Sequence, residues 1–290
     1  MIPMMNIIAW SGTAPWAELR QVEQDLIISR ALVAIFSDPA LNTALRFRGG
    51  TALNKLLFPK PLRYSEDIDL VRTEAGPIGP VLDRIRTVLE PWLGRAAFEQ
   101  SQVAPKLRFR ADAEDGSAPM RLKVEINMRE IVAFDPPEKL TLEIDNPWFT
   151  GTAEIGTYSR EELLGTKLRA LLQRDKGRDL LDLAHALAVF PELKKARVVE
   201  CLSLYLKNGG IAISRAEAEQ RMLAKLAAPS FVTDIRPLLS AQEAELMTDD
   251  AVRQAFVSVF RDVVMLLPGA SGAKTPERLE RYGLSLTEHV

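Results

Sequence analysis

The sequence has very little cysteine and histidine. Its one cysteine, Cys201, cannot form an internal disulfide, and no Cys-x-x-Cys pair is present, so we expect a reducing compartment. Its two histidines, His185 and His289, leave little material for a histidine-based metal site or a Ser-His-Asp triad. If the protein is an enzyme, carboxylates, lysines and arginines must carry the chemistry.

Long apolar runs and a strong net charge are also lacking. No run approaches the roughly 20 residues that a membrane helix needs. The N-terminus "MIPMMNIIAWSGTAPW" lacks the basic start and sustained apolar core of a signal peptide. We therefore expect a cytoplasmic protein that does not contact a membrane. The formal net charge is -2, so nucleic acid must be met by a local basic patch rather than by bulk attraction.

The order of the periodic patterns predicts an α+β fold. The expected strands are 45–47, 67–71, 107–111, 121–128 and 140–144, with helices at 16–36 and 80–93. From Ser159 onward the pattern is helical. We expect an α/β domain over 1–155, an all-helical domain over 156–268, and a flexible linker and tail over 269–290.

Two aspartates alternate with apolar residues in "RYSEDIDL", so Asp67 and Asp69 point to the same side of the expected strand. Like charges this close are unfavourable unless a cation lies between them or one carboxylate takes up a proton. Carboxylates on one rigid strand suit a hard divalent cation such as Mg2+. The alternative is an edge strand with solvated charges. Arg63 and Ser65, just before the pair, favour the metal site.

A glycine pair lies upstream, in "RGGTALNK". Adjacent Gly49 and Gly50 let the backbone approach a ligand closely and leave amides available at a helix start. Arg48 adds a cation there, and Thr51 adds a hydroxyl. A plain turn is the alternative, and we interpret the stretch as a candidate phosphate cradle.

A second alternating segment, "RLKVEIN", places its apolar residues on one side and Lys123, Glu125 and Asn127 on the other. If this strand lies beside the strand that carries Asp67 and Asp69, Glu125 supplies a third carboxylate to the metal site. The alternative is a polar strand face without a ligand.

The stretch "KLRALLQRDKGRDLLDL" places charged residues among leucines. Lys167 shares an apolar helix face with Arg174, so both are candidates to meet a triphosphate above the metal site. Snorkelling of their side chains to water is the alternative. Asp179 fits a helix N-cap. Asp182 lies among apolar residues, where it tethers Lys167 or Arg178 or acts as a base.

Together, "RGGTALNK", "RYSEDIDL", "KVEIN" and "KLRALLQRDKGRDLLDL" resemble the AbiEii/AbiGii-type nucleotidyltransferase toxins of the DNA polymerase β-like nucleotidyltransferase superfamily, over residues 16–190. The resemblance implies a nucleotidyltransferase-like mixed sheet flanked by helices, followed by a helical half that completes the active site. It implies that Asp67 and Asp69 bind Mg2+ or Mn2+, and that Lys167 and Asp182 match the functional lysine and aspartate of the later motifs. Arg48 stands where the family often has lysine, which keeps a cation but alters its geometry.

The resemblance further implies the toxin of a type IV toxin–antitoxin or phage-defence pair, with a cognate antitoxin. Such toxins transfer a nucleotide from an NTP to an acceptor, which in characterised relatives is the tRNA 3′ end. The expected catalytic residues are Asp67, Asp69, Lys167 and Asp182, and the expected metal ligands are Asp67, Asp69 and Glu125. The expected nucleotide-binding residues are Arg48, Gly49, Gly50, Thr51, Arg63, Ser65, Arg174 and Arg178.

Two other functions fit the same residues. One is transfer to the hydroxyl of a small molecule, and the other is a non-catalytic regulator that binds NTP or RNA. The intact Asp67–Asp69 pair favours catalysis, because a pure binder need not keep both carboxylates. An RNA acceptor needs local basic residues, and the candidates are Lys55, Lys60, Arg63, Arg174, Lys176 and Arg178.

Overall fold

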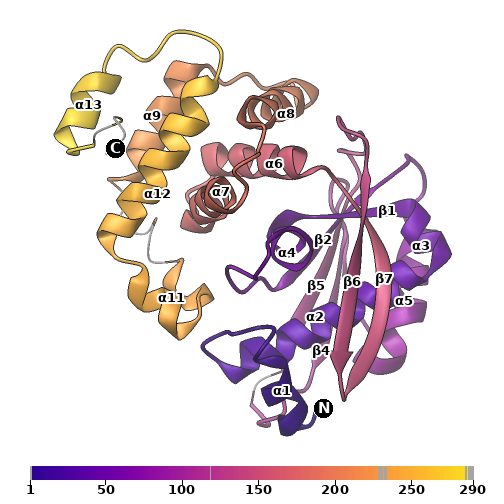
Figure 1. Ribbon diagram of the computed structural model, residues 1–290. Coiled ribbons are helices and arrows are strands. Elements are labelled where there is room, and N and C mark those ends of the chain that lie inside the picture. Colours follow the sequence, from indigo (N-terminus) through magenta and orange to yellow (C-terminus); the bar gives the residue numbers. More distant parts are fainter. Residues whose placement is uncertain (1, 118, 228–230, 232–233, 285, 287–290) are drawn as a thin grey trace. The chain divides into compact units, whose positions relative to one another are not determined.

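The computed structural model (Figure 1) describes residues 2–117, 119–227, 231, 234–284 and 286. The chain divides into two units, Met1–Ser159 and Arg160–Val290. Within the described ranges, no helix combines the length and the apolar character needed to cross a membrane.

The first unit is built on a mixed five-stranded sheet, which confirms the predicted α+β class (Figure 1). Strand β2 is antiparallel to β1 and parallel to β5, and the remaining pairs are antiparallel. In spatial order the strands are β1 (Leu45–Arg48), β2 (Asp67–Arg72), β5 (Met120–Asn127), β4 (Lys106–Ala111) and β3 (Ala97–Glu99).

The alternation predicted for the central strands is present. Ile68 and Leu70 of β2 are buried on one face of the sheet, as are Val124 and Ile126 of β5. The charged residues between them therefore share the opposite face. Burial of branched apolar side chains on one face holds the register of the two strands, because a slip of one residue would expose the whole set.

Helices and a hairpin complete the first unit. The helical elements are α1 (Met4–Trp10), α2 (Leu19–Ser37), α3 (Pro39–Ala44), α4 (Gly49–Ala52), the π-helical turn η1 (Leu53–Leu57) and α5 (Gly79–Leu93). Strands β6 (Glu138–Asn146) and β7 (Phe149–Thr157) form a separate antiparallel hairpin that packs against α2. The sequence patterns predicted neither α1, α3, β3 nor β7.

The second unit is helical in its described part, as predicted. Helix α6 packs against both α7 and α8, and the apolar face of α6 meets the buried Cys201 and Leu202 of α8. Its elements are α6 (Arg160–Gln173), α7 (Gly177–Val189), α8 (Lys195–Asn208), α9 (Arg215–Lys225), η2 (Arg236–Leu238), α11 (Ala241–Leu246), α12 (Asp249–Asp262), η3 (Val264–Leu266) and α13 (Thr275–Arg281).

The segment expected to be a flexible linker and tail differs from the prediction, because it contains α13. Thr275 is buried, and its hydroxyl donates a hydrogen bond to Glu219 Oε2 at 2.7 Å. Ser271 Oγ and the Gly272 amide donate to the same oxygen at 2.7 and 2.9 Å. The buried carboxylate of Glu219 thus holds this segment against α9, a long-range contact that local composition does not indicate.

Candidate active site

Asp67 and Asp69 stand side by side on one face of β2, as the alternation predicted. The side chain of Asp67 is 34% exposed, and Asp69 is half-buried. Burial, and then the neighbouring carboxylate of Asp67, raise the pKa of Asp69 above its ordinary value, against the opposing effect of Arg48 and Lys123. The two carboxylates therefore repel each other, and a divalent cation, which prefers oxygen ligands, would offset this repulsion.

Gly49 packs directly against Asp69. Its φ of +84° is rarely adopted by other residues, and a Cβ at this position would lie 2.4 Å from Asp69 Oδ2. Arg48, the residue before it, is paired in register with Asp69 across the two strands. The sequence predicted that Gly49 lets a phosphate come close to the backbone. In the structure, the missing side chain of Gly49 lets the turn pack against the Asp69 carboxylate.

The mutation Gly49→Ala is expected to destabilise the first unit by roughly 3 kcal/mol, the combined cost of a left-handed alanine and an overpacked contact. Gly116→Ala is the matched control, since Gly116 also has a positive φ (+68°) but a Cβ there meets nothing within 4 Å. That control is expected to lose about 1 kcal/mol. Urea unfolding followed by tryptophan fluorescence measures both, because all four tryptophans lie in the first unit. Equal losses in the two variants would contradict the steric role of Gly49.

Hydroxyl and amide groups tie the glycine turn to the loop before Asp67. Thr51 Oγ1 donates to the Asp67 carbonyl at 2.5 Å and lies 2.8 Å from Ser65 Oγ. Asn54, which the sequence reasoning did not select, accepts the amides of Leu62 and Arg63. Because Thr51 is buried and its hydroxyl is engaged in these contacts, its observed role is to position Asp67.

Three cations of this region form contacts within the protein: Arg48, Lys55 and Arg63. Arg48 forms a 2.5 Å ion pair with Glu130, a residue that the sequence reasoning missed. Lys55 pairs with the buried carboxylate of Asp25, also at 2.5 Å.

Arg63 is only 2% exposed, and its guanidinium donates to the Tyr64 carbonyl at 3.1 Å. The structure therefore corrects the expectation that Arg63 and Lys55 face a ligand or RNA, whereas Lys60 is exposed.

Glu125 lies beside the aspartate pair, because β5 is the parallel neighbour of β2 and places Asp69 opposite Glu125. The same register places Lys123 opposite Asp67. Lys123 Nζ lies 2.9 Å from Asp67 Oδ2 and 3.3 Å from Glu125 Oε2. Across the described residues, no three His, Cys, Asp or Glu side chains converge as a metal-binding group. Asp67 and Glu125 therefore both contact the Lys123 ammonium.

The second unit contains a buried ion-pair cluster. Lys167 Nζ lies 2.9 Å from Asp182 Oδ2 and 3.2 Å from Asp179 Oδ1, and both carboxylates are fully buried. Arg174 binds Asp179 through two hydrogen bonds of 2.6 and 2.8 Å. Burial alone would raise the pKa of Asp179, but Arg174 and Lys167 hold it below its ordinary value.

This geometry decides between the alternatives for the cluster. Asp182 tethers Lys167, as one interpretation of the sequence required. Asp179 is not an N-cap, because α7 starts at Gly177 with Lys176 as the capping residue. Lys167 is buried rather than snorkelled, and Arg178 is half-buried at the start of α7.

The loop between α6 and α7 is held from α9, which the sequence reasoning did not anticipate. Lys225 is buried and donates to the Arg174 carbonyl at 2.8 Å and to Asp175 Oδ1 at 2.6 Å. The Gly177 amide donates to Asp234 Oδ1 at 3.1 Å. These contacts fix the start of α7 and hence the position of Asp179.

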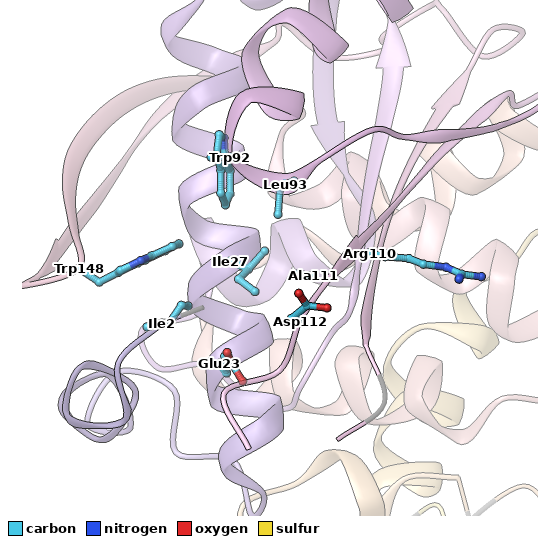
Figure 2. Close-up of a pocket in the computed structure, with 9 residues that line it drawn as sticks. All are labelled: Ile2, Glu23, Ile27, Trp92, Leu93, Arg110, Ala111, Asp112 and Trp148. Atoms are coloured by element: carbon cyan, nitrogen blue, oxygen red, sulfur yellow. The ribbon is translucent and has the colours of Figure 1, made fainter. Parts of the chain in front are cut away.

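The first unit also contains a cavity of about 260 Å³ (Figure 2). Trp92, Trp148 and Ile27 line it together with Glu23 and Asp112, and the other lining residues come from α5, β4 and the N-terminus. None of the residues predicted to bind nucleotide or metal lines this cavity.

Comparison with known proteins identifies one family model and several solved structures with a similar fold. The family model described as "Nucleotidyl transferase AbiEii toxin, Type IV TA system" matches residues 30–261. No curated protein matches the chain in sequence.

Two solved structures share the fold over most of their length. The nucleotidyltransferase toxin MenT4 from Mycobacterium tuberculosis H37Rv has a TM-score of 0.61 and 20% identity, over 88% of this chain and 89% of that one. JHP933 from Helicobacter pylori has a TM-score of 0.54 and 16% identity, over 92% of this chain and 98% of that one. At these identities the likeness shows the fold.

Proposed function

The chain belongs to the AbiEii family of nucleotidyl transferase toxins of type IV toxin–antitoxin systems, and from this premise we propose that it transfers a nucleotide from an NTP to an RNA hydroxyl, the 3′ end of tRNA. The observation that carries the proposal is the Asp67–Asp69 pair on one strand face, with Gly49 packed against Asp69. Such a pair can hold a divalent ion against the phosphates of a nucleotide. A toxin of this family implies a cognate antitoxin as a partner.

The first unit supplies the carboxylates. Asp67 and Asp69 would hold Mg2+ or Mn2+, which when bound neutralises charge on the phosphates as pyrophosphate leaves. Thr51 and Ser65 keep Asp67 in place through their hydrogen bonds. The amides of the glycine turn are the proposed contacts to phosphate oxygens.

Within the second unit, Lys167 and Asp182 are the residues that the family resemblance assigns to the reaction. We include both as required residues, together with Arg174, which is 46% exposed at its side chain. Arg174 orients its guanidinium on Asp179 through two bonds, so the side chain is preorganised rather than freely rotating.

The test is a transfer assay with the full chain, each of the four α-labelled NTPs, Mg2+ and total tRNA. Label is expected on RNA with at least one NTP and is expected to disappear when EDTA removes the divalent ion. Periodate-oxidised tRNA, which lacks the terminal hydroxyls, is the matched control substrate and is expected to accept no label.

The other outcomes separate the rival functions. Label on oxidised tRNA would place the acceptor elsewhere on the RNA. Label in a small molecule of a cell extract, with none on RNA, would favour modification of a small hydroxyl compound. The absence of any metal-dependent transfer with extract or tRNA would contradict the proposed function.

A further inference from the structure

The face of the sheet around the aspartate pair carries cations as well as carboxylates. Asp67, Asp69 and Glu125 share this face, and Lys123 lies among them in the β2–β5 register. Its ammonium contacts Asp67 Oδ2 at 2.9 Å and Glu125 Oε2 at 3.3 Å. A divalent ion shared by Asp67 and Glu125 would have to occupy the space between these two oxygens, where the ammonium lies.

A second lysine approaches Glu125 from the other side. Lys106, which is opposite Glu125 on β4, has its Nζ 3.9 Å from Glu125 Oε2 and 3.0 Å from Glu99 Oε1. Glu125 is thus flanked by two ammonium groups, whereas the Asp69 carboxylate has Gly49 packed against it. The three carboxylates of this face are therefore not equivalent as metal ligands.

The other cations around this face are paired with carboxylates. Arg48 is paired with Glu130, and both Lys106 and Arg108 are paired with Glu99. A lysine ammonium is a compact point charge with three donors, so it can bridge two carboxylates as a metal ion would.

We infer that Lys123 takes the place of a second metal ion, so that this protein binds one divalent ion through Asp67 and Asp69, with Glu125 serving as the anchor of Lys123. This inference rests on the proposed function, because it concerns the metal site of the same reaction. It replaces the expectation that Glu125 is a metal ligand.

The experiment is a titration of the full chain with Mn2+ alone, followed by electron paramagnetic resonance. The wild type is expected to bind one ion per chain with the spectrum of an isolated Mn2+. Lys123→Met, which removes the ammonium but keeps the length of the side chain, is expected to bind two ions with a spin-coupled spectrum, because two ions in one site lie ~4 Å apart. Glu125→Gln is expected to change the Mn2+ dissociation constant of the wild-type site by less than about twofold, whereas loss of a coordinating carboxylate costs tenfold or more.

Lys139→Met is the control, because Lys139 is an exposed lysine of β6 outside this face, and it is expected to behave as the wild type. Two coupled ions in the wild type, a tenfold weakening by Glu125→Gln, or a single ion in Lys123→Met would each overturn the inference. If the wild type binds two ions and still transfers label to RNA, the inference fails and the proposed function stands. If it binds no ion and transfers no label, both fail.

Discussion

Asp69→Asn is expected to reduce nucleotidyl transfer by roughly a thousandfold or more, which corresponds to about 4 kcal/mol of transition-state stabilisation. Asparagine keeps the shape of the side chain that packs against Gly49 but loses the charge on which the proposed divalent-ion site depends. The transfer assay described above measures the loss directly.

The same mutation is expected to leave the first unit equally or more stable towards urea. Burial and the Asp67 carboxylate both disfavour the charged form of Asp69, which is why its pKa is raised. Removing that charge removes an unfavourable contact of the folded state, as expected where function is maintained at a cost in stability.

Asp145→Asn is the control for Asp69→Asn. Asp145 is an exposed aspartate on β6, so its replacement is expected to change neither transfer nor the urea midpoint. Transfer by Asp69→Asn within tenfold of the wild type would contradict the role of this carboxylate. A large fall in its urea midpoint would instead show that the charge stabilises the fold.

Lys167→Met is expected to destabilise the second unit by about 3–5 kcal/mol, the usual cost of removing one partner of a buried ion pair. Lys167 lies within 3.2 Å of both Asp179 and Asp182, and both carboxylates are fully buried. Without the ammonium, the two buried aspartates repel each other, while Arg174 remains bound to Asp179. Methionine fills the space of the lysine stem, so the loss reports the charge rather than a cavity.

Circular dichroism at 222 nm during urea unfolding measures this loss, because the described part of the second unit is helical. Tryptophan fluorescence reports the first unit alone and provides the internal reference. Lys207→Met, at an exposed lysine in the last turn of α8, is the control and is expected to shift neither signal. A helix signal unchanged in Lys167→Met would show that the cluster does not stabilise the unit.

Most elements of the fold were predictable from local patterns, and the exceptions have physical causes. The alternation of β2, β4 and β5 is clear because each buries one face. Strand β7 was missed because "FTGTAEIGT" contains glycines and threonines that resemble a loop, and its pairing with β6 and packing on α2 make it a strand. Helix α1 has only seven residues and is held by the hydrogen bond from Trp10 to Asp25.

Some features of the candidate site follow from local patterns, and others depend on tertiary contacts. That Asp67 and Asp69 point together follows from the period of a strand and needs no tertiary information. The approach of Gly49 to Asp69, the engagement of Arg48 by Glu130 and the burial of Arg63 all depend on segments that meet only in the folded chain.

The amino-acid order alone therefore determined the candidate site residues: a carboxylate pair after a glycine turn, and a lysine–aspartate set on later helices. The tertiary structure alone decided which of these groups face one another. Lys123 lies against Asp67 because β2 and β5 are parallel and in one register, with more than 50 residues between them. Local periodicity reports the face on which a side chain lies, whereas the partner on that face is chosen by long-range strand pairing.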